Sequence, residues 1–244
     1  IIGSAVSGLL ASGLGRKKSL FLAGCLFFVS ALGSMEPEFL VFSHGEPSFS
    51  LMIMFNIYRI IGGVGVGLAS AICPMYIGEV SPSNIRGMLV SWNQFAIIFG
   101  QLLVYFINFL ILGSNANPVL DLVNGTYQIM NPEASAWTVA TGWRYMFGSE
   151  AVPAGLFALL ICLVPESPRY LVMTGRDDAA TRILTRINGR TQALAIIQDI
   201  RNTIVERTER LFSYGFICIF VGIMLSVFQQ AVGINAVLYY APRI

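Results

Sequence analysis

The sequence predicts an all-α polytopic membrane protein, on three observations. Hydrophobic residues make up 55% of the 244 residues and charged residues only 11%, whereas about 25% of residues are charged in an average soluble protein. Apolar runs of about 20 residues, the length that crosses a bilayer as a helix, recur along the chain. Basic residues gather in alternate connections between these runs.

The apolar runs predict five complete spans and one fragment. The fragment ends at Leu14, and the spans cover residues 19–35, 51–77, 87–112, 142–164 and 212–240. The chain opens inside one apolar run and closes just after another. We therefore expect it to be an internal portion of a longer protein.

The basic residues predict which connections face the cytoplasm. Arg16, Lys17 and Lys18, then Arg86, then eight arginines in the connection 165–211 account for twelve of the fifteen Lys and Arg residues. The connections 36–50 and 113–141 contain none. This alternation follows the positive-inside rule, so the basic connections are predicted to be cytoplasmic.

The long basic connection, residues 165–211, is predicted to be helical. Ser167-Pro168 is typical of an N-cap followed by proline in the first turn, and Gly175 can end that helix. A second helix is expected over 177–187, ending at Asn188-Gly189, and a third over about 191–209. Because acidic residues alternate with the arginines, a solvated helical face is favoured over a nucleic-acid-binding surface.

The composition argues against an enzyme, a metal site and a cofactor. His44 is the only histidine, and the four cysteines lie in apolar runs, where small packing residues are the simpler interpretation. No nucleophile–base pair is apparent at membrane depth. We expect no catalytic residue, no metal, no cofactor and no nucleic-acid partner.

Polar side chains recur on one face of the span 87–112. Gln94, Gln101 and Asn108 are seven residues apart, which places them within about 40° on a helix. Such a stripe faces a bundle interior or a wet cavity rather than lipid. The alternative is hydrogen bonding between packed helices.

A second group of polar side chains lies in the last span. Gln229, Gln230, Asn235 and Tyr239 cannot all face one point on a straight helix. Gly233, which lies between them, tolerates a break that would bring them to one cavity wall. Interrupted helices are a recurrent feature of transporter sites. Because amides donate and accept hydrogen bonds, as sugar hydroxyls do, a neutral polyol is the expected ligand.

Arg59 is the second anomaly, because an arginine at bilayer depth costs ~2.5–3.5 kcal/mol on insertion scales. Its own span offers no carboxylate before Glu79, so we expect a partner on another span. A carboxylate facing Arg59 can exchange its charge partner for a proton, which is a basis for proton coupling. A structural ion pair or a snorkelling side chain remains open as an alternative. Nearby, four glycines between Gly62 and Gly67 predict close helix packing.

Several motifs resemble the sugar porter family of the major facilitator superfamily, and within it the bacterial D-xylose–proton symporters. The matching stretches are YRIIGGVGVGLAS (58–70), PMYIGEVSPSNIRG (74–87), NQFAIIFGQLLVY (93–105), GWRYMF (142–147), VPESPRYL (164–171) and FQQAVGINAVLYYAP (228–242). Members of this family have twelve spans in two six-helix bundles joined by a cytoplasmic helical segment.

The resemblance implies a partial major facilitator fold, with the end of span two, spans three to seven and the central helices. Residues 1–164 would be part of the N-terminal bundle, 165–211 the cytoplasmic linker domain, and 212–244 the first helix of the C-terminal bundle. Sugar-binding residues would be Gln94, Gln101, Gln229, Gln230, Asn235 and Tyr239. Arg59 would face the proton-accepting aspartate of span one, and a cytoplasmic gate would involve Arg16, Glu79, Arg86, Glu166 and Arg169.

The expected function is proton-coupled import of a pentose or hexose, D-xylose-like, by alternating access. The partners would be a monosaccharide, a proton and the lipid bilayer of the inner cell membrane, and the carrier would act as a monomer. Two alternatives remain open: a facilitator of the same sugars without protons, and a sugar sensor on the same fold.

Overall fold

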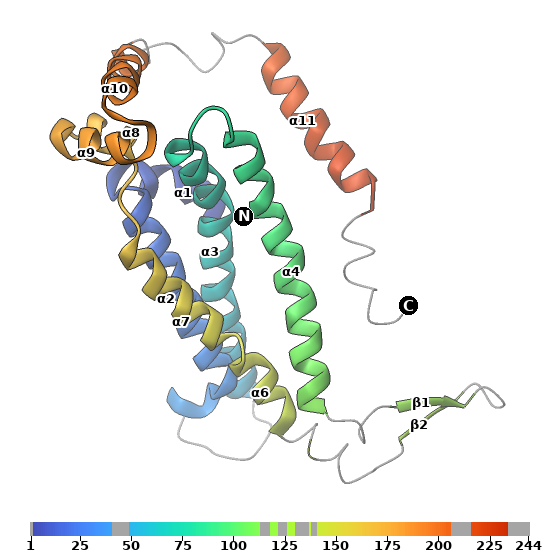
Figure 1. The fold of residues 1–244 in the computed structure, drawn as a ribbon. Helices are drawn as coiled ribbons and strands as arrows, with labels where there is room; N and C mark the ends of the chain where they lie inside the picture. The colour runs from blue at the N-terminus through green and yellow to red at the C-terminus, as the bar shows by residue number, and fades with distance from the viewer. Residues whose placement is uncertain are drawn as a thin grey trace. The chain divides into compact units, whose positions relative to one another are not determined.

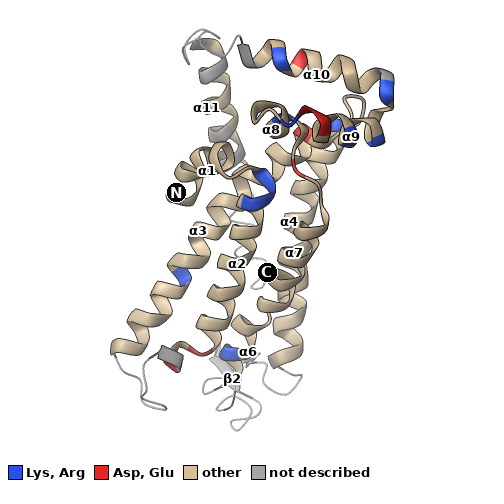
Figure 2. Ribbon diagram, turned by 90° about the vertical axis from the view of Figure 1, so that its left-hand side faces the viewer, with Lys and Arg blue, Asp and Glu red and all other residues tan. Residues whose placement is uncertain are grey.

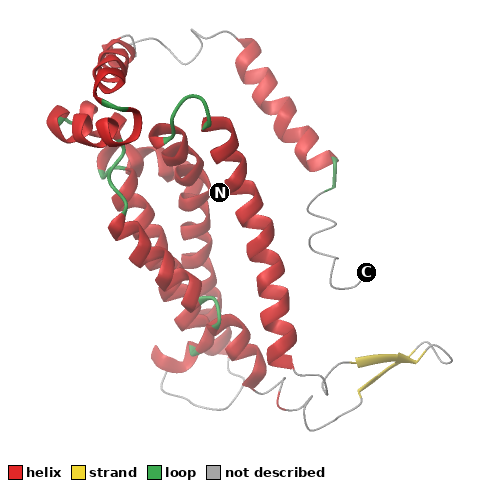
Figure 3. Cartoon of the chain, in the orientation of Figure 1, coloured by secondary structure: helices red, strands yellow, loops and turns green. Residues whose placement is uncertain are grey.

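The structure is a computed structural model that describes residues 2–40, 49–112, 118–121, 126–129, 137, 141–205 and 216–233. Its architecture is helical, apart from one short pair of strands (Figures 1 and 3). The chain divides into two compact units, Ile1–Leu194 and Ala195–Ile244, and the boundary falls inside one helix. Each unit is described by itself.

The core of the first unit lies where three helices meet. Helices α1 (Ile2–Gly13), α2 (Arg16–Met35) and α3 (Phe49–Val80) pack together (Figure 1). The buried cluster consists of Ala11, Leu20, Ala23, Leu68 and Ile72. Alanine and glycine line much of this interface, which lets the helix backbones approach closely without a large hydrophobic term, as is usual between helices in lipid.

Two glycines on facing helices allow the closest approach in this core. A Cβ atom on Gly3 would collide with the carbonyl oxygen of Val64, and one on Gly67 would lie 2.7 Å from the backbone nitrogen of Ser4. Gly62 lies directly against Ser30. The packing expected for the glycine cluster is found at these positions. Gly63 is different, because a Cβ atom there would meet nothing within 4 Å.

Two further stretches are long and apolar enough to cross a membrane. Helix α4 (Arg86–Leu112) follows α3 after a short turn. Helices α6 (Trp143–Gly148) and α7 (Ala151–Leu163) form a nearly continuous span, interrupted by the turn at Ser149-Glu150. With α2 and α3, this gives four membrane-spanning candidates among the described residues. These four correspond to the four predicted spans between residues 19 and 164.

The connections at the end of the bundle opposite the basic segments contain two small elements. A 3-10 helix, η1 (Pro37–Leu40), follows α2 and contacts α3. Strands β1 (Pro118–Asp121) and β2 (Thr126–Ile129) form an antiparallel pair in which Pro118 lies opposite Ile129. The sequence predicted only a connection in this region, because the strand segments are too short to show a clear alternation of apolar and polar residues.

The linker helices begin and end close to the predicted positions. Helix α8 (Pro168–Met173) is capped by Ser167, whose hydroxyl oxygen accepts a hydrogen bond from the Tyr170 backbone nitrogen at 3.4 Å. Helix α9 (Asp177–Asn188) follows Gly175, which has a φ of 73°. Gly189, with a φ of 81°, separates α9 from α10 (Arg190–Val205). Positive φ angles favour glycine, which explains both helix ends.

The second unit contains helix α11 (Phe216–Ala231), the described part of the span predicted over 212–240. The helix ends two residues before Gly233, which has a φ of 74°. The predicted interruption therefore coincides with a left-handed glycine at this position. The residues after Gly233 lie outside the described part of the chain.

Candidate functional site

The cytoplasmic-gate residues predicted from the sequence begin with a buried ion pair. Arg16 lies at the start of α2 and Glu79 at the end of α3. The Arg16 Nε and Nη2 atoms each donate to a different Glu79 carboxylate oxygen, both at 2.8 Å. The side chains are only 8% and 12% exposed. A bidentate arginine–carboxylate pair of this kind fixes orientation as well as charge.

Glu166 extends this cluster to the linker. Its Oε1 atom accepts hydrogen bonds from the backbone nitrogens of Arg16 and Lys17 at 3.1 Å and of Ser167 at 2.8 Å. The Ser167 hydroxyl donates to Glu79. Gly15, with a φ of 92°, makes this possible, because a Cβ atom there would lie 2.6 Å from the Glu166 carboxylate. The Glu166 carboxylate thus joins the turn between α1 and α2 to the residues that immediately precede α8.

The other two predicted gate residues are not part of this cluster. Arg86 is exposed at the start of α4, and Arg169 is half-buried in α8. Within the described part of the chain, neither forms an ion pair within 4.0 Å. The structure therefore brings Arg16, Glu79 and Glu166 together, and leaves Arg86 and Arg169 outside the group.

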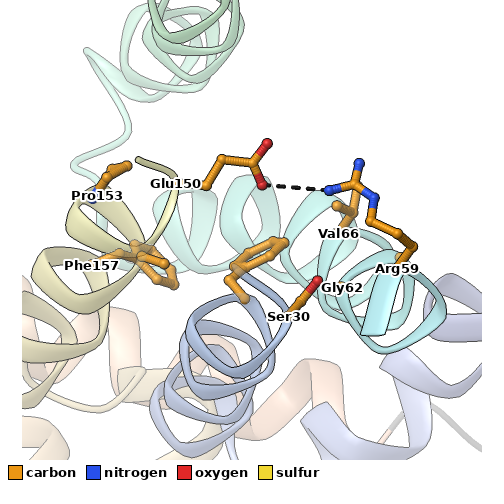
Figure 4. A pocket seen from close by; sticks show the side chains of 10 residues that line it. Ser30, Arg59, Gly62, Val66, Glu150, Pro153 and Phe157 are labelled. Carbon is orange, nitrogen blue, oxygen red and sulfur yellow. Dashed lines mark ion pairs between the residues drawn. The ribbon is translucent and has the colours of Figure 1, made fainter. Parts of the chain in front are cut away.

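Arg59 lies in α3 beside a cavity of about 420 Å³ that is formed with α2 and α7 (Figure 4). Its Nη1 atom is 3.6 Å from Oε2 of Glu150, in the turn between α6 and α7. Its guanidinium group also lies 5.0 Å from the centre of the Phe147 ring. Among the described residues, Glu150 is therefore the carboxylate that pairs with Arg59. Ser30, Val66 and Phe157 line the same cavity.

The Arg59–Glu150 contact differs in kind from a fixed structural pair. Both side chains are 44% exposed, and a single atom pair at 3.6 Å is longer than a charge-assisted hydrogen bond. Water that enters the cavity can reach both charged groups. Of the described residues, none forms a cluster suited to a metal ion.

The three predicted polar side chains of α4 lie in different surroundings. Gln94 is exposed, whereas Gln101 is half-buried and its amide donates to the Tyr105 hydroxyl at 3.0 Å. The Asn108 amide oxygen is buried, and no described residue donates a hydrogen bond to it. A buried acceptor of this kind is costly unless water or another group satisfies it.

The second predicted group of sugar-binding residues lies on and beyond α11. Gln229 and Gln230 belong to the last turn of that helix. Asn235 and Tyr239 lie outside the described residues. Because α4 and α11 belong to different units, convergence of these residues with Gln94 and Gln101 stays a prediction.

Two carboxylates with clear structural roles were missed in the sequence. Glu150 is the only acidic residue in the apolar run 142–164, and this isolation was the available signal. Glu38, in η1, accepts a hydrogen bond from Arg144 Nη2 at 2.6 Å, and Arg144 Nη1 donates to the Met35 carbonyl oxygen at 3.2 Å. This pair joins α6 to the end of α2, at the opposite end of the bundle from Arg16 (Figure 2).

Comparisons with known proteins agree with these observations. A family model described as "Sugar (and other) transporter" matches residues 1–244. The D-xylose-proton symporter of Escherichia coli is 45% identical over the whole chain, which covers 48% of that protein. The arabinose-proton symporter of Bacillus subtilis is 37% identical, and the chain covers 47% of it.

A solved structure of the proton:xylose symporter XylE bound to 6-bromo-6-deoxy-D-glucose is similar in fold. The TM-score is 0.80 at 45% identity, covering 99% of this chain and 49% of that one. The chain thus spans about half the length of the curated relatives it matches. These relatives are transporters rather than enzymes. The chain belongs to the sugar transporter family, and its helices form part of a major facilitator fold.

Proposed function

We propose that this chain is part of a proton-coupled importer of a pentose or hexose, D-xylose-like, which works by alternating access. The observation that carries the proposal is an arginine and a carboxylate facing each other across a cavity in a sugar-transporter chain. Proton coupling requires a site where a carboxylate can hold either a proton or a positively charged partner. The similarity to two pentose–proton symporters supports the substrate class.

Arg59 and Glu150 form the proton-sensitive part of the proposed mechanism. When Glu150 is charged, it holds the guanidinium group of Arg59. Protonation of Glu150 leaves Arg59 free to pair with another carboxylate, such as the aspartate of span one that the family resemblance implies. The single contact of 3.6 Å supports this exchange, because a pair held by several short charge-assisted hydrogen bonds would be more costly to separate.

Sugar binding is proposed to involve amides from two helices. Gln94 and Gln101 on α4 supply one side, and Gln229, Gln230, Asn235 and Tyr239 supply the other. The left-handed Gly233 after α11 supports the interrupted helix that this arrangement needs. Amide groups suit an uncharged sugar, because each can donate and accept hydrogen bonds with adjacent hydroxyls.

The orientation, domains and gate complete the proposal. The basic connections and the linker face the cytoplasm of an inner cell membrane, by the positive-inside rule. Residues 1–164 belong to the N-terminal bundle, 165–211 to the linker, and 212–244 to the C-terminal bundle of a monomeric carrier. At the gate, Arg16, Glu79 and Glu166 hold the bundle and linker together, while Arg86 and Arg169, which form no ion pair with a described residue, would pair with the second bundle.

The sugar site is tested by binding in the full-length parent protein. Gln94→Ala and Gln230→Ala should each weaken binding of D-xylose about tenfold, measured by calorimetry, because an unpaired sugar hydroxyl costs about 1–2 kcal/mol. Asn56→Ala is the matched control, since its amide is exposed and bonds within its own helix to Met52. Unchanged affinity in both glutamine variants would remove these residues from the site.

Coupling is tested by uptake into cells expressing the parent protein, with and without a protonophore. Accumulation against a gradient should collapse on adding the protonophore, and Glu150→Gln should abolish accumulation while sugar binding persists. Uptake that ignores the protonophore would instead identify a facilitator.

A further inference from the structure

A groove on the linker is lined by three arginines that the proposed transport mechanism does not use. It has a volume of about 620 Å³ and lies along α9 and the start of α10. Its lining residues are Asp178, Thr181, Arg182, Thr185, Arg186, Arg190 and Leu194. Arg182 and Arg186 also line a second hollow of about 280 Å³, together with Ala179 and Ile183.

The arginines are held on the outer face of α9. Ala180 and Leu184 are buried, and α9 packs against α8. At 100° per residue, Arg182 and Arg186 lie about 200° and 240° around the helix from Ala180. Their side chains therefore point away from α8 and the rest of the first unit. All three arginines are exposed.

Within the part of the chain that the structure describes, neighbouring carboxylates do not pair with these charges. Across the described residues, Arg182, Arg186 and Arg190 have no acidic partner within 4.0 Å. The Arg182 Nε atom contacts only a backbone carbonyl oxygen, that of Asp178, at 3.4 Å. Asp178 is the one acidic side chain that lines the groove. Three guanidinium groups and two threonine side chains thus surround a space with an excess of positive charge.

This combination suits a phosphate group. Arginine binds phosphate oxygens through paired N–H donors, and threonine hydroxyls add further polar contacts. The spacing of four residues between Arg182 and Arg186 sets the two guanidinium groups on neighbouring turns. A single phosphate between them can contact both.

The position of α9 indicates where that phosphate comes from. Figures 1 and 2 both place α9 beside α8, just beyond the ends of α2 and α7. Helix α8 is fixed there, because the Tyr170 hydroxyl donates to the Gly13 carbonyl oxygen at 3.0 Å. The headgroup layer of a bilayer is about 5–8 Å thick on each side of the hydrocarbon core. Arginines that point outward at this level are within reach of the lipid phosphates around the bundle.

We propose that the α9 groove binds the phosphate headgroup of an anionic phospholipid through Arg182, Arg186 and Arg190. By the orientation proposed above, the lipid belongs to the cytoplasmic leaflet. The lipid would hold the linker against the membrane surface beside the first bundle. Binding of the lipid itself does not require sugar or transport.

The test is lipid binding by the detergent-solubilised full-length parent protein, measured by native mass spectrometry with phosphatidylglycerol or phosphatidylcholine at equal concentration. Phosphatidylglycerol should bind about tenfold more tightly. The double variant Arg182→Gln/Arg186→Gln should lose this preference, since each arginine near an anionic surface contributes about a fivefold factor. Asp178→Asn should shift affinity the other way, because it removes the like charge beside the phosphate.

Arg176→Gln/Arg201→Gln is the matched control, because it removes two linker arginines that do not line the groove. This control should keep the preference, and circular dichroism should show equal helix content in all variants. Equal loss in both double variants would mean a general charge effect and would overturn the site, as would equal binding of both lipids by the unaltered chain.

A third experiment distinguishes a lipid phosphate from a soluble phosphate as the ligand of the groove. Inorganic phosphate and glycerol phosphate at millimolar concentration should displace phosphatidylglycerol only weakly. If either binds the groove as tightly as the lipid does, the groove is a site for a soluble phosphate, and the lipid proposal is wrong. Sugar uptake is measured separately, so failure of this proposal is distinct from failure of the proposed transport function.

Discussion

Two of the three arginine–glutamate ion pairs among the described residues are built in different ways. Arg16 and Glu79 are almost completely buried and joined by two hydrogen bonds of 2.8 Å. Arg59 and Glu150 are each 44% exposed and meet at one distance of 3.6 Å beside a cavity. The same two side-chain types therefore form a buried pair with two short hydrogen bonds in one place and a longer contact, exchangeable in the proposed mechanism, in the other. The two pairs differ in the number of hydrogen bonds that hold them and in their exposure.

The largest expected effect is at the buried pair. Arg16→Ala should lower the free energy of unfolding by about 3–5 kcal/mol, because it leaves the Glu79 charge buried without its partner. Chemical unfolding in detergent measures this. Lys18→Ala is the control, since Lys18 is exposed two residues further along α2. A loss below 1 kcal/mol for Arg16→Ala would mean that burial does not distinguish the two pairs.

The Arg144–Glu38 pair lies at the opposite end of the bundle from Arg16. Its loss should lower the free energy of unfolding by less than loss of the Arg16–Glu79 pair, and by more than loss of the Arg59–Glu150 contact. The Arg144 side chain is 19% exposed, and that of Glu38 is 7% exposed. Arg144→Ala should cost about 1.5–3 kcal/mol, the range for hydrogen bonds to charged groups. The same unfolding experiment applies, with the exposed Arg176→Ala as its control. A cost equal to that of Arg16→Ala would show that the extra contacts around Arg16 add nothing.

Ser167 tests how much the neighbours of the buried pair contribute. Ser167→Ala removes both the hydroxyl that donates to Glu79 and the cap of α8, so we expect a loss of about 1 kcal/mol. Ser91→Ala provides the comparison, because the Ser91 hydroxyl is exposed and bonds only within its own helix. The difference in unfolding free energy between the two variants measures the contribution of the linker contact. Equal losses would contradict it.

The smallest effect on stability is expected at the exchangeable contact. Glu150→Gln should change the free energy of unfolding by less than about 1 kcal/mol, as for partly exposed ion pairs. Glu36→Gln, at another exposed acidic residue, is the control. A large loss of stability in Glu150→Gln would make this a structural pair, and the contrast with Arg16 would disappear.

Local features of the fold were predictable because they depend on residues that are close together in the sequence. The cap at Ser167 and the helix ends at Gly175 and Gly189 follow from the hydroxyl and from the positive φ that glycine allows. The four spans follow from hydrophobic length alone. Each of these features depends on one short stretch of sequence, so it can be predicted without knowing which helices pack together.

Features that depend on which helices are neighbours were not predictable in the same way. The need for a partner to Arg59 was visible in the sequence, but its identity as Glu150 depends on α3 and α6 lying together. Gly63 looked like its neighbours, yet no described atom would lie within 4 Å of a Cβ atom placed there. The gate prediction placed five charged residues in one group, and only three of them form a described cluster. The sugar-binding residues stay a prediction.

The attachment of α8 has a consequence for how a rocking carrier would move. Glu166, Ser167 and Tyr170 tie this short helix to the ends of α1, α2 and α3. Helix α8 should therefore move with the first bundle as one rigid body rather than act as a flexible linker. Any swivel between the two halves has to lie further along the chain, where α9 and α10 can change their angle without breaking these bonds.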